Sequence, residues 1–463
     1  MKNTNHFLNS LAVKFNSLDL RNYAIVSLLV LWVGTAFSIA LMEISVVCGL
    51  IFWMGWKIQL KTVAMPSLPS PNAAIGATDT GFTPNAYGNI KAPLGAQSNK
   101  IDWTLWIPLA LFCVMVIASF FTSEYPKQSF RGLYKIAKPL LVFFMLGNLF
   151  GDPRSQKRFD TVFLLTFLVM TIDCSIQYAF GKDLLRLCPA QNSSAGIRLP
   201  GPFGSFSKMA SYLILAIPVF AMQCWTQFIQ PDHRRKGYYQ LILTLSGILL
   251  LYLTRSRGPV LALGLSFAAL FIYNRWFKTL GIVGLLCLSF LNFAPRGMIV
   301  HLDAQNKEQS IVERVELWKR AWNVIEAKPW LGTGINTYND AHEKYDKEKN
   351  WRVRGYYAHN GYLQLGAEIG IPGILFFLIF LFMFFRRSLQ AANQVRGSPE
   401  ELLQLGLLVG LLSFLLYAAV DNNLQSPPSI MMFWYLAGIL MGRISASQAT
   451  RDTPGILNGN VTA

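Results

Sequence analysis

Long uninterrupted runs of apolar residues constrain the fold of this chain more than any other feature. Residues 241–253 and 374–385 are almost wholly apolar on every side, and similar blocks recur along the sequence. A helix of about 20 apolar residues spans the hydrocarbon core of a bilayer, where only helices or closed barrels satisfy the backbone. Barrel strands alternate apolar and polar residues, which these runs do not. The sequence therefore predicts an all-α integral membrane protein.

The apolar blocks between polar breaks predict about twelve membrane-spanning helices. Their ranges are 23–39, 42–57, 103–121, 136–150, 161–180, 209–228, 239–254, 259–274, 279–294, 362–385, 403–420 and 429–442. The first two are short, so residues 23–57 form either two spans or one re-entrant hairpin around Glu43. Basic residues gather in short loops on one side of the predicted bundle, and such loops stay in the cytoplasm. This pattern predicts a multi-pass protein of the bacterial inner membrane with both termini cytoplasmic.

The polar segments give the expected domain organisation. It comprises a cytoplasmic N-terminus at 1–22, helices 1–9 at 23–294 with a cytoplasmic linker at 58–102, a long periplasmic loop at 295–361, helices 10–12 at 362–442 and a cytoplasmic tail at 443–463. Within the periplasmic loop, Ile311, Val315, Trp318, Trp322 and Ile325 recur at helical spacing, and charged residues occupy the other faces. This spacing predicts an amphipathic helix ended by a proline, with its tryptophans at a membrane interface or on the roof of the bundle.

Four arginines fall on the outer side, where the positive-inside tendency disfavours them. They are Arg198, Arg255, Arg257 and Arg314. A guanidinium group is always charged and binds phosphate oxygens in a two-pronged geometry, so several converging arginines indicate a phosphate or diphosphate clamp. The alternative is that these side chains are anchors whose charged ends reach the aqueous interface.

His359 lies where the long loop returns to the membrane, beside Asn360 and a pair of tyrosines. A histidine with a pKa near neutrality can accept a proton from a sugar hydroxyl within hydrogen-bond reach. The position therefore favours proton transfer, and the alternative is an ordinary polar residue at the interface.

Several classes of function are disfavoured. Lys plus Arg number 41 against 24 Asp plus Glu, but the cytoplasmic loops account for much of the formal charge of +17, so no nucleic-acid partner is expected. No carboxylate cluster lies beside the outer arginines, so a bound metal is not indicated. The chain has neither a P-loop nor a GxSxG motif, which excludes by these signatures an ATP-driven pump and a serine hydrolase. No cofactor is expected.

Four segments resemble the bacterial O-antigen ligase and O-antigen polymerase superfamily of polytopic glycosyltransferases. They are RLPGPFGSFSKMASYL at 198–213, LTRSRGPVLAL at 253–263, RVELWKRAWNVIEAKPWLGTGINTY at 314–338 and AHNGYLQLGAEIGIPG at 358–373. The first of these motifs often has Asn where this chain has Ser207 or Lys208.

The resemblance implies a periplasmic reaction on a polysaccharide carried by undecaprenyl diphosphate. It implies that Arg257 and Arg314 hold the diphosphate, with Arg198 and Arg255 as supporting candidates. It also implies that His359 activates or positions an acceptor hydroxyl, which attacks the anomeric carbon with inversion and without a metal. Acceptor glycans or glycolipids and membrane lipids are the expected partners.

Three readings of the activity remain open at this stage. The first is a ligase that joins the glycan to a lipid A core sugar, which the long amphipathic outer loop favours because a lipid-borne acceptor arrives sideways. The second is a polymerase, or an oligosaccharyltransferase whose acceptor is a protein hydroxyl. The third is a small-anion transporter, which would need polar residues near the middle of several helices. Asp173 is the clearest such residue, and Lys138 lies near one end of its span.

Overall fold

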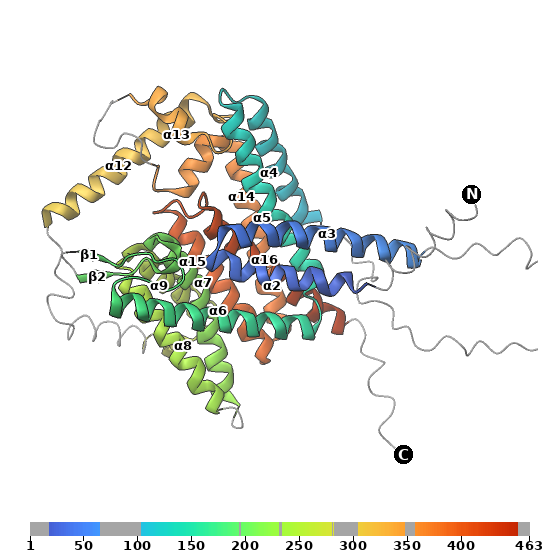
Figure 1. The fold of residues 1–463 in the computed structure, drawn as a ribbon. Helices are drawn as coiled ribbons and strands as arrows, with labels where there is room; N and C mark the ends of the chain where they lie inside the picture. The colour runs from blue at the N-terminus through green and yellow to red at the C-terminus, as the bar shows by residue number, and fades with distance from the viewer. Residues whose placement is uncertain are drawn as a thin grey trace, which may run out of the picture.

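The computed structural model describes residues 18–64, 103–193, 196–230, 234–279, 281, 304–347 and 357–451. Within these ranges, ten helices are long and apolar enough to cross a membrane. They are α2 (Leu20–Phe37), α3 (Ile39–Ala64), α4 (Trp103–Phe121), α5 (Pro126–Leu149), α6 (Pro153–Phe180), α7 (Phe206–Ile229), α8 (Arg234–Leu253), α14 (Gly361–Gln394), α15 (Pro399–Ala418) and α16 (Pro427–Arg451). A shorter apolar helix, α9, covers Arg257–Tyr273. The all-α membrane fold is confirmed (Figure 1).

Every predicted span other than 279–294 coincides with a described helix, and that span lies outside the described residues apart from 279 and 281. Residues 23–57 form two helices, because extended backbone at Ser38 separates α2 from α3, which pack against each other. Two predicted polar segments begin later than expected. The linker is helical as far as Ala64 and the tail as far as Arg451, and the rest of both lies outside the described residues.

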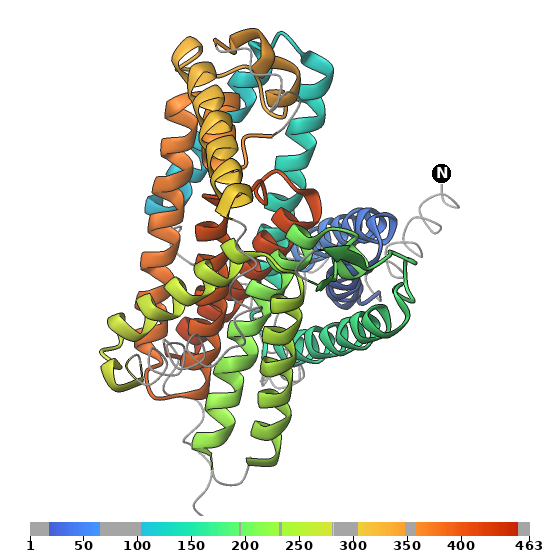
Figure 2. The same ribbon diagram turned by 90° about the vertical axis from the view of Figure 1, so that its left-hand side faces the viewer.

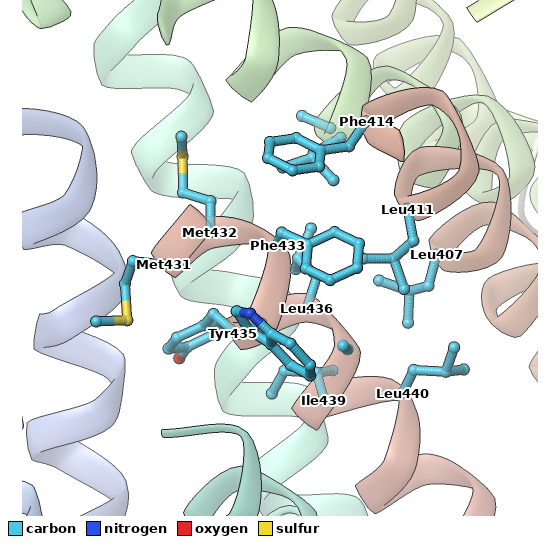
Figure 3. Close-up of a cluster of buried hydrophobic side chains, with 14 of the residues drawn as sticks. Leu407, Leu411, Phe414, Met431, Met432, Phe433, Tyr435, Leu436, Ile439 and Leu440 are labelled. Carbon is cyan, nitrogen blue, oxygen red and sulfur yellow. The ribbon is translucent and has the colours of Figure 1, made fainter. Parts of the chain in front are cut away.

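The core of the bundle is centred on α15 and α16. Helix α16 packs against α2, α5, α7, α14 and α15, and most of its side chains are buried. Figure 3 shows side chains of α15 and α16 meeting in this core, where the rings of Phe414 and Phe433 stack at 5.1 Å between centroids. Trp32 of α2 joins the core through Tyr435, at 5.1 Å between ring centroids. This packing fixes the two ends of α15, and one of these ends borders the candidate site.

Helix α14 contains a kink that receives a turn from the preceding loop. Gly370 has φ +76° inside the helix, and Ile371 N donates to Pro329 O at 2.7 Å. A Cβ at Gly370 would lie 2.2 Å from Trp330 O, and one at Gly332 would lie 2.3 Å from the carbonyl carbon of Glu368. Only glycine permits two backbones to approach this closely. The buried Glu368 carboxylate accepts from the backbone N–H of Asn336, at 2.8 Å, which fixes the turn on the helix.

The predicted amphipathic helix is present as α12 (Ala304–Ala327). Of the predicted apolar stripe, Ile325 is buried, whereas Val315 and Trp322 are 40% and 51% exposed, and Leu317, Ala321 and Val324 are covered beside it. Arg320, one of the charged residues predicted on the other faces, is buried in an ion pair with Asp346 at 2.7 Å. Helix α12 therefore packs on α14 and on the short helix η3 (His342–Tyr345) through its small and aliphatic side chains, and leaves aromatic surface open.

Further short elements follow α6. Strands β1 (Gln191–Ser193) and β2 (Gly196–Arg198) pair antiparallel, and the 3-10 helix η1 spans Gly201–Phe203. The sequence did not predict this hairpin. Figure 2 shows α12 and the ends of α4 and α5 at one end of the molecule, with α7 and α8 projecting from the other.

Candidate functional site

The β2 hairpin brings Arg198 and Arg255 to one corner of the molecule. Leu199 N donates to Leu253 O at 3.1 Å, and Arg198 Nε donates to Thr254 O at 3.3 Å, so the hairpin docks on the turn between α8 and α9. Arg255 has φ +55° in this turn, and a Cβ at Gly196 would lie 3.3 Å from its Nη2. Two of the four predicted arginines therefore share one corner, which we call the arginine corner.

Aromatic rings support both guanidinium groups of the arginine corner. Arg198 lies over the ring of Phe206, 3.9 Å from its centroid, and Arg255 lies over Tyr252 at 4.4 Å. Burial lowers the pKa of Arg198, although a guanidinium keeps its proton at neutral pH. Arg255 Nε is buried without a hydrogen-bond partner among the described residues. The corner therefore holds positive charge in a partly dry setting, which favours an anion.

Arg257 begins α9, and its side chain is exposed. The following residue, Gly258, lies against α15, since a Cβ there would sit 3.1 to 3.2 Å from Val420 and Tyr417. The start of α9 is therefore held beside the end of α15. Arg257 is the most accessible of the four arginines, and it stands between the arginine corner and the loop after α15.

His359 sits immediately before the cap of α14. It has φ +48°, and the next residue, Asn360, caps the helix by accepting from Tyr362 N and Leu363 N at 3.0 and 3.1 Å. Gly361 N donates to Asp421 O at 3.1 Å, which ties this helix start to the loop after α15. The side chain of His359 is half-buried. The local backbone thus fixes where the imidazole stands.

Two charged side chains interact with the imidazole from different elements. Burial lowers the pKa of His359, the nearby Asp421 carboxylate opposes that shift, and the Arg314 guanidinium adds to it. Asp421 comes from the loop after α15 and Arg314 from α12. The predicted partners Arg314 and His359 are therefore brought together, with a carboxylate that the sequence argument missed.

Asp421 is held by a compact set of hydroxyl groups. Ser207 Oγ donates to Asp421 Oδ1 at 2.9 Å, and the Tyr417 hydroxyl donates to Oδ2 at 2.6 Å. Ser207 and Tyr417 are themselves 3.0 Å apart. These bonds fix the orientation of the Asp421 carboxylate. Ser207 is one of the two positions at which this chain departs from the motif it resembles, and its hydroxyl has a definite partner here.

The two groups of charges meet at the start of α7. Phe206 stacks under Arg198, and its neighbour Ser207 binds Asp421. One helix start therefore joins the arginine corner to the triad of Asp421, His359 and Arg314. The arrangement brings positive charge, an imidazole and a carboxylate to one region of the molecule, which suits transfer of a group away from an anionic leaving group.

The described residues contain no group of three or more His, Cys, Asp or Glu side chains that could hold a metal ion. A mechanism without a metal remains a prediction.

A comparison with family models shows which known family part of this chain is similar to. Residues 242–378 match the family model described as O-antigen ligase. This segment carries an O-antigen ligase domain. The resemblance to the O-antigen ligase and polymerase superfamily is confirmed by this match. No curated protein matches the chain.

The O-antigen ligase domain contains Arg255, Arg257, Arg314 and His359, but the site also draws on residues outside it. Arg198 and Ser207 precede the domain, whereas Tyr417 and Asp421 follow it. The flanking residues hold the corner and the carboxylate in place through the bonds described above. The domain match therefore accounts for the charged groups, and the surrounding helices account for their positions.

Proposed function

We propose that this chain is a glycosyltransferase that moves a glycan from undecaprenyl diphosphate to an acceptor hydroxyl at the outer face of the inner membrane. The observation that carries this proposal is that the helix start beside His359 is tied to the loop of Asp421 by the bond from Gly361 N to Asp421 O at 3.1 Å, and that Asp421 and Arg314 both act electrostatically on the imidazole. The O-antigen ligase match supports the chemistry, because that family acts on lipid-linked glycans. The reaction inverts the anomeric carbon and needs no metal.

The arginines act on the leaving group. Arg257, with Arg198 and Arg255 beside it, binds the diphosphate, and Arg314 adds positive charge near the reacting carbon. Negative charge grows on the diphosphate as the glycosidic bond breaks, so preorganised guanidinium groups stabilise the transition state more than the bound substrate. The buried unpartnered Nε of Arg255 supports this role, because an anion would supply the missing acceptor.

His359 acts on the acceptor. Burial and Arg314 keep its imidazole neutral at pH 7, so it accepts the proton of the acceptor hydroxyl as that oxygen attacks. Asp421 faces the imidazolium that results and stabilises its charge, the role a carboxylate plays beside a catalytic histidine. The proton leaves on the histidine, and the electron pair of the broken bond leaves on the diphosphate.

One observation supports a ligase with a lipid A core sugar as acceptor, and a second argues against a transporter. Helix α12 presents open aromatic surface at the outer end, where a lipid-borne acceptor arrives from the side. The two polar residues within predicted spans that a transporter would need, Asp173 and Lys138, are already bound to other groups of the protein. Asp173 accepts from Leu184 N at 2.8 Å, and Lys138 pairs with Glu43. A polymerase, or a transferase with a protein acceptor, is the alternative within the same chemistry.

Deletion of the chain, followed by gel analysis of lipopolysaccharide and of lipid-linked glycan, tests this proposal. For a ligase, we expect long chains to be absent from lipid A core and to accumulate on undecaprenyl diphosphate. Single repeat units on lipid A core would instead identify a polymerase. Unchanged glycans in both fractions would contradict glycan transfer and would favour the transporter instead.

A further inference from the structure

A groove of about 350 Å³ lies on the open side of α12. Two tryptophans, Trp318 and Trp322, line it together with Asn323 and two lysines, Lys319 and Lys347. The groove therefore combines flat aromatic faces with an amide and two ammonium groups. Among the side chains that line it, none is a carboxylate.

The groove begins where the reaction site ends. Arg314, which interacts with His359, stands one helical turn before Trp318 on the same helix, and residues four apart in a helix are neighbours. Leu363, which also lines the groove, lies in the first turn of α14, four residues after His359 in the chain. A chain bound in the groove would therefore lie close to the helix start that carries the imidazole.

Trp322 is exposed but held in one orientation. Its Nε1 donates to Glu326 Oε1 at 2.8 Å, and Lys347 Nζ donates to Glu326 Oε2 at 3.0 Å. One carboxylate therefore fixes both an aromatic ring and an ammonium group at the edge of the groove. An aromatic side chain that is already oriented loses little entropy when a ligand stacks on it.

Trp318 contributes its ring rather than its N–H to the groove. Its Nε1 is buried, with less than 1 Å² of accessible surface, so a ligand in the groove meets the indole ring. A sugar ring suits this lining, because its C–H face is apolar like the indoles. Its hydroxyl groups can pair with the amide of Asn323 and the ammonium groups of Lys319 and Lys347.

The position of the groove relative to the arginine corner indicates whether it binds the donor glycan or the acceptor glycan. The arginine corner, which binds the leaving diphosphate, is built by β2 and the start of α9, whereas the groove is built by α12 and α14. In an inverting transfer, the acceptor attacks from the face opposite the leaving group. We propose that this groove binds the oligosaccharide of the acceptor and presents its terminal hydroxyl to His359. This inference rests on the proposed function for the direction of attack.

A binding measurement on the full chain in lipid nanodiscs tests the inference without requiring turnover. The probe is core oligosaccharide released by mild acid from lipopolysaccharide of a deletion strain. We expect Trp318→Ala and Trp322→Ala each to weaken binding about tenfold, which corresponds to about 1.4 kcal/mol. Trp330→Ala is the matched control, because Trp330 follows the same helix and is 74% exposed but does not line the groove. It should bind as the wild type does.

Three outcomes overturn the inference or separate it from the proposed function. If the wild-type chain does not bind the core oligosaccharide, or if the Trp318 and Trp322 variants bind it normally, the groove is not the acceptor site. A membrane anchor would give a different result. Brominated lipid in the nanodisc would quench the fluorescence of Trp322, which is identified by its loss in Trp322→Phe, and oligosaccharide binding by that variant would be unchanged. If binding depends on both tryptophans but no glycan is transferred, the inference stands and the proposed transferase fails.

Discussion

The two ends of α15 border arginines whose charges are balanced in different ways. At its start, Arg443 is only 3% exposed and pairs with Asp160 at 2.6 Å and Glu400 at 3.1 Å. At its end, Arg257 is exposed, and among the described residues Arg198 and Arg255 contact rings, a hydroxyl and a carbonyl rather than carboxylates. A guanidinium that the protein neutralises serves the fold, whereas one left without a carboxylate is available to an outside anion.

The largest loss of transfer activity should come from changing His359, which lies near the arginines at the end of α15. His359→Ala removes the base, so transfer should fall by about 10² to 10⁴-fold, the usual contribution of a positioned base. The rate of glycan transfer in reconstituted membranes measures this change, and membrane abundance is the control. His342→Ala is a comparison, because His342 lies outside the site and stacks on Tyr338. Normal transfer by the His359 variant would remove it from the mechanism.

The second prediction concerns Arg443 and its carboxylate partners at the start of α15. Arg443→Ala removes a buried guanidinium that pairs with Asp160 and Glu400, whose side chains are 34% and 28% exposed. Because water reaches both carboxylates, the loss should stay below the roughly 3 to 5 kcal/mol that breaking a fully buried pair costs. We expect a loss of thermal stability in detergent with little change in transfer per folded molecule. Arg257→Ala is the mirror experiment, with unchanged stability and transfer lowered by about 10² to 10³-fold. If both variants lost stability equally, the distinction between the two ends of α15 would be wrong.

The acid limb of the pH–rate profile gives a finer test. His359 must be neutral to accept a proton, and its pKa is lowered, so kcat/KM should stay high below pH 6.5 and fall only in more acidic buffer. Asp421 raises this pKa and Arg314 lowers it. The midpoint should therefore move to lower pH in Asp421→Asn and to higher pH in Arg314→Gln. Shifts in the same direction would contradict the proposed environment of the imidazole.

The smallest effect is expected at the arginine corner. Arg198→Lys keeps the positive charge but loses the planar group that lies over Phe206, so transfer should fall by less than about tenfold. Arg198→Gln removes the charge and should cost more. The ratio of the two variants, measured as kcat/KM for the lipid-linked glycan, separates the stacking contribution from the charge. Equal losses would mean that the ring contact contributes nothing.

Hydropathy predicted the helices, because a membrane span is determined by a continuous run of apolar residues. The charged residues of the site were predicted from their types and places, but their grouping was not, since Arg198 and Arg255 meet only through the unpredicted hairpin. Asp421 was missed because it stands alone in a loop without periodicity. The one available signal was a carboxylate just after an apolar span on the outer side. The side of α12 that packs on the bundle was not predicted, because the contact is made by Leu317, Ala321 and Val324, which the tryptophan spacing did not single out.

The close docking of the turn at Gly332 on the kink at Gly370 has a consequence for protein engineering. Because the two backbones touch, the turn from Pro329 to Gly332 and the kink at Gly370 depend on each other, and a chimera that takes them from different parents would separate surfaces that fit only each other. A chimera that exchanges α12 to alter acceptor choice should therefore join its halves before Ala304 and after Ala327. Designs that respect these boundaries keep the docked turn native and confine the change to the helix that carries the groove.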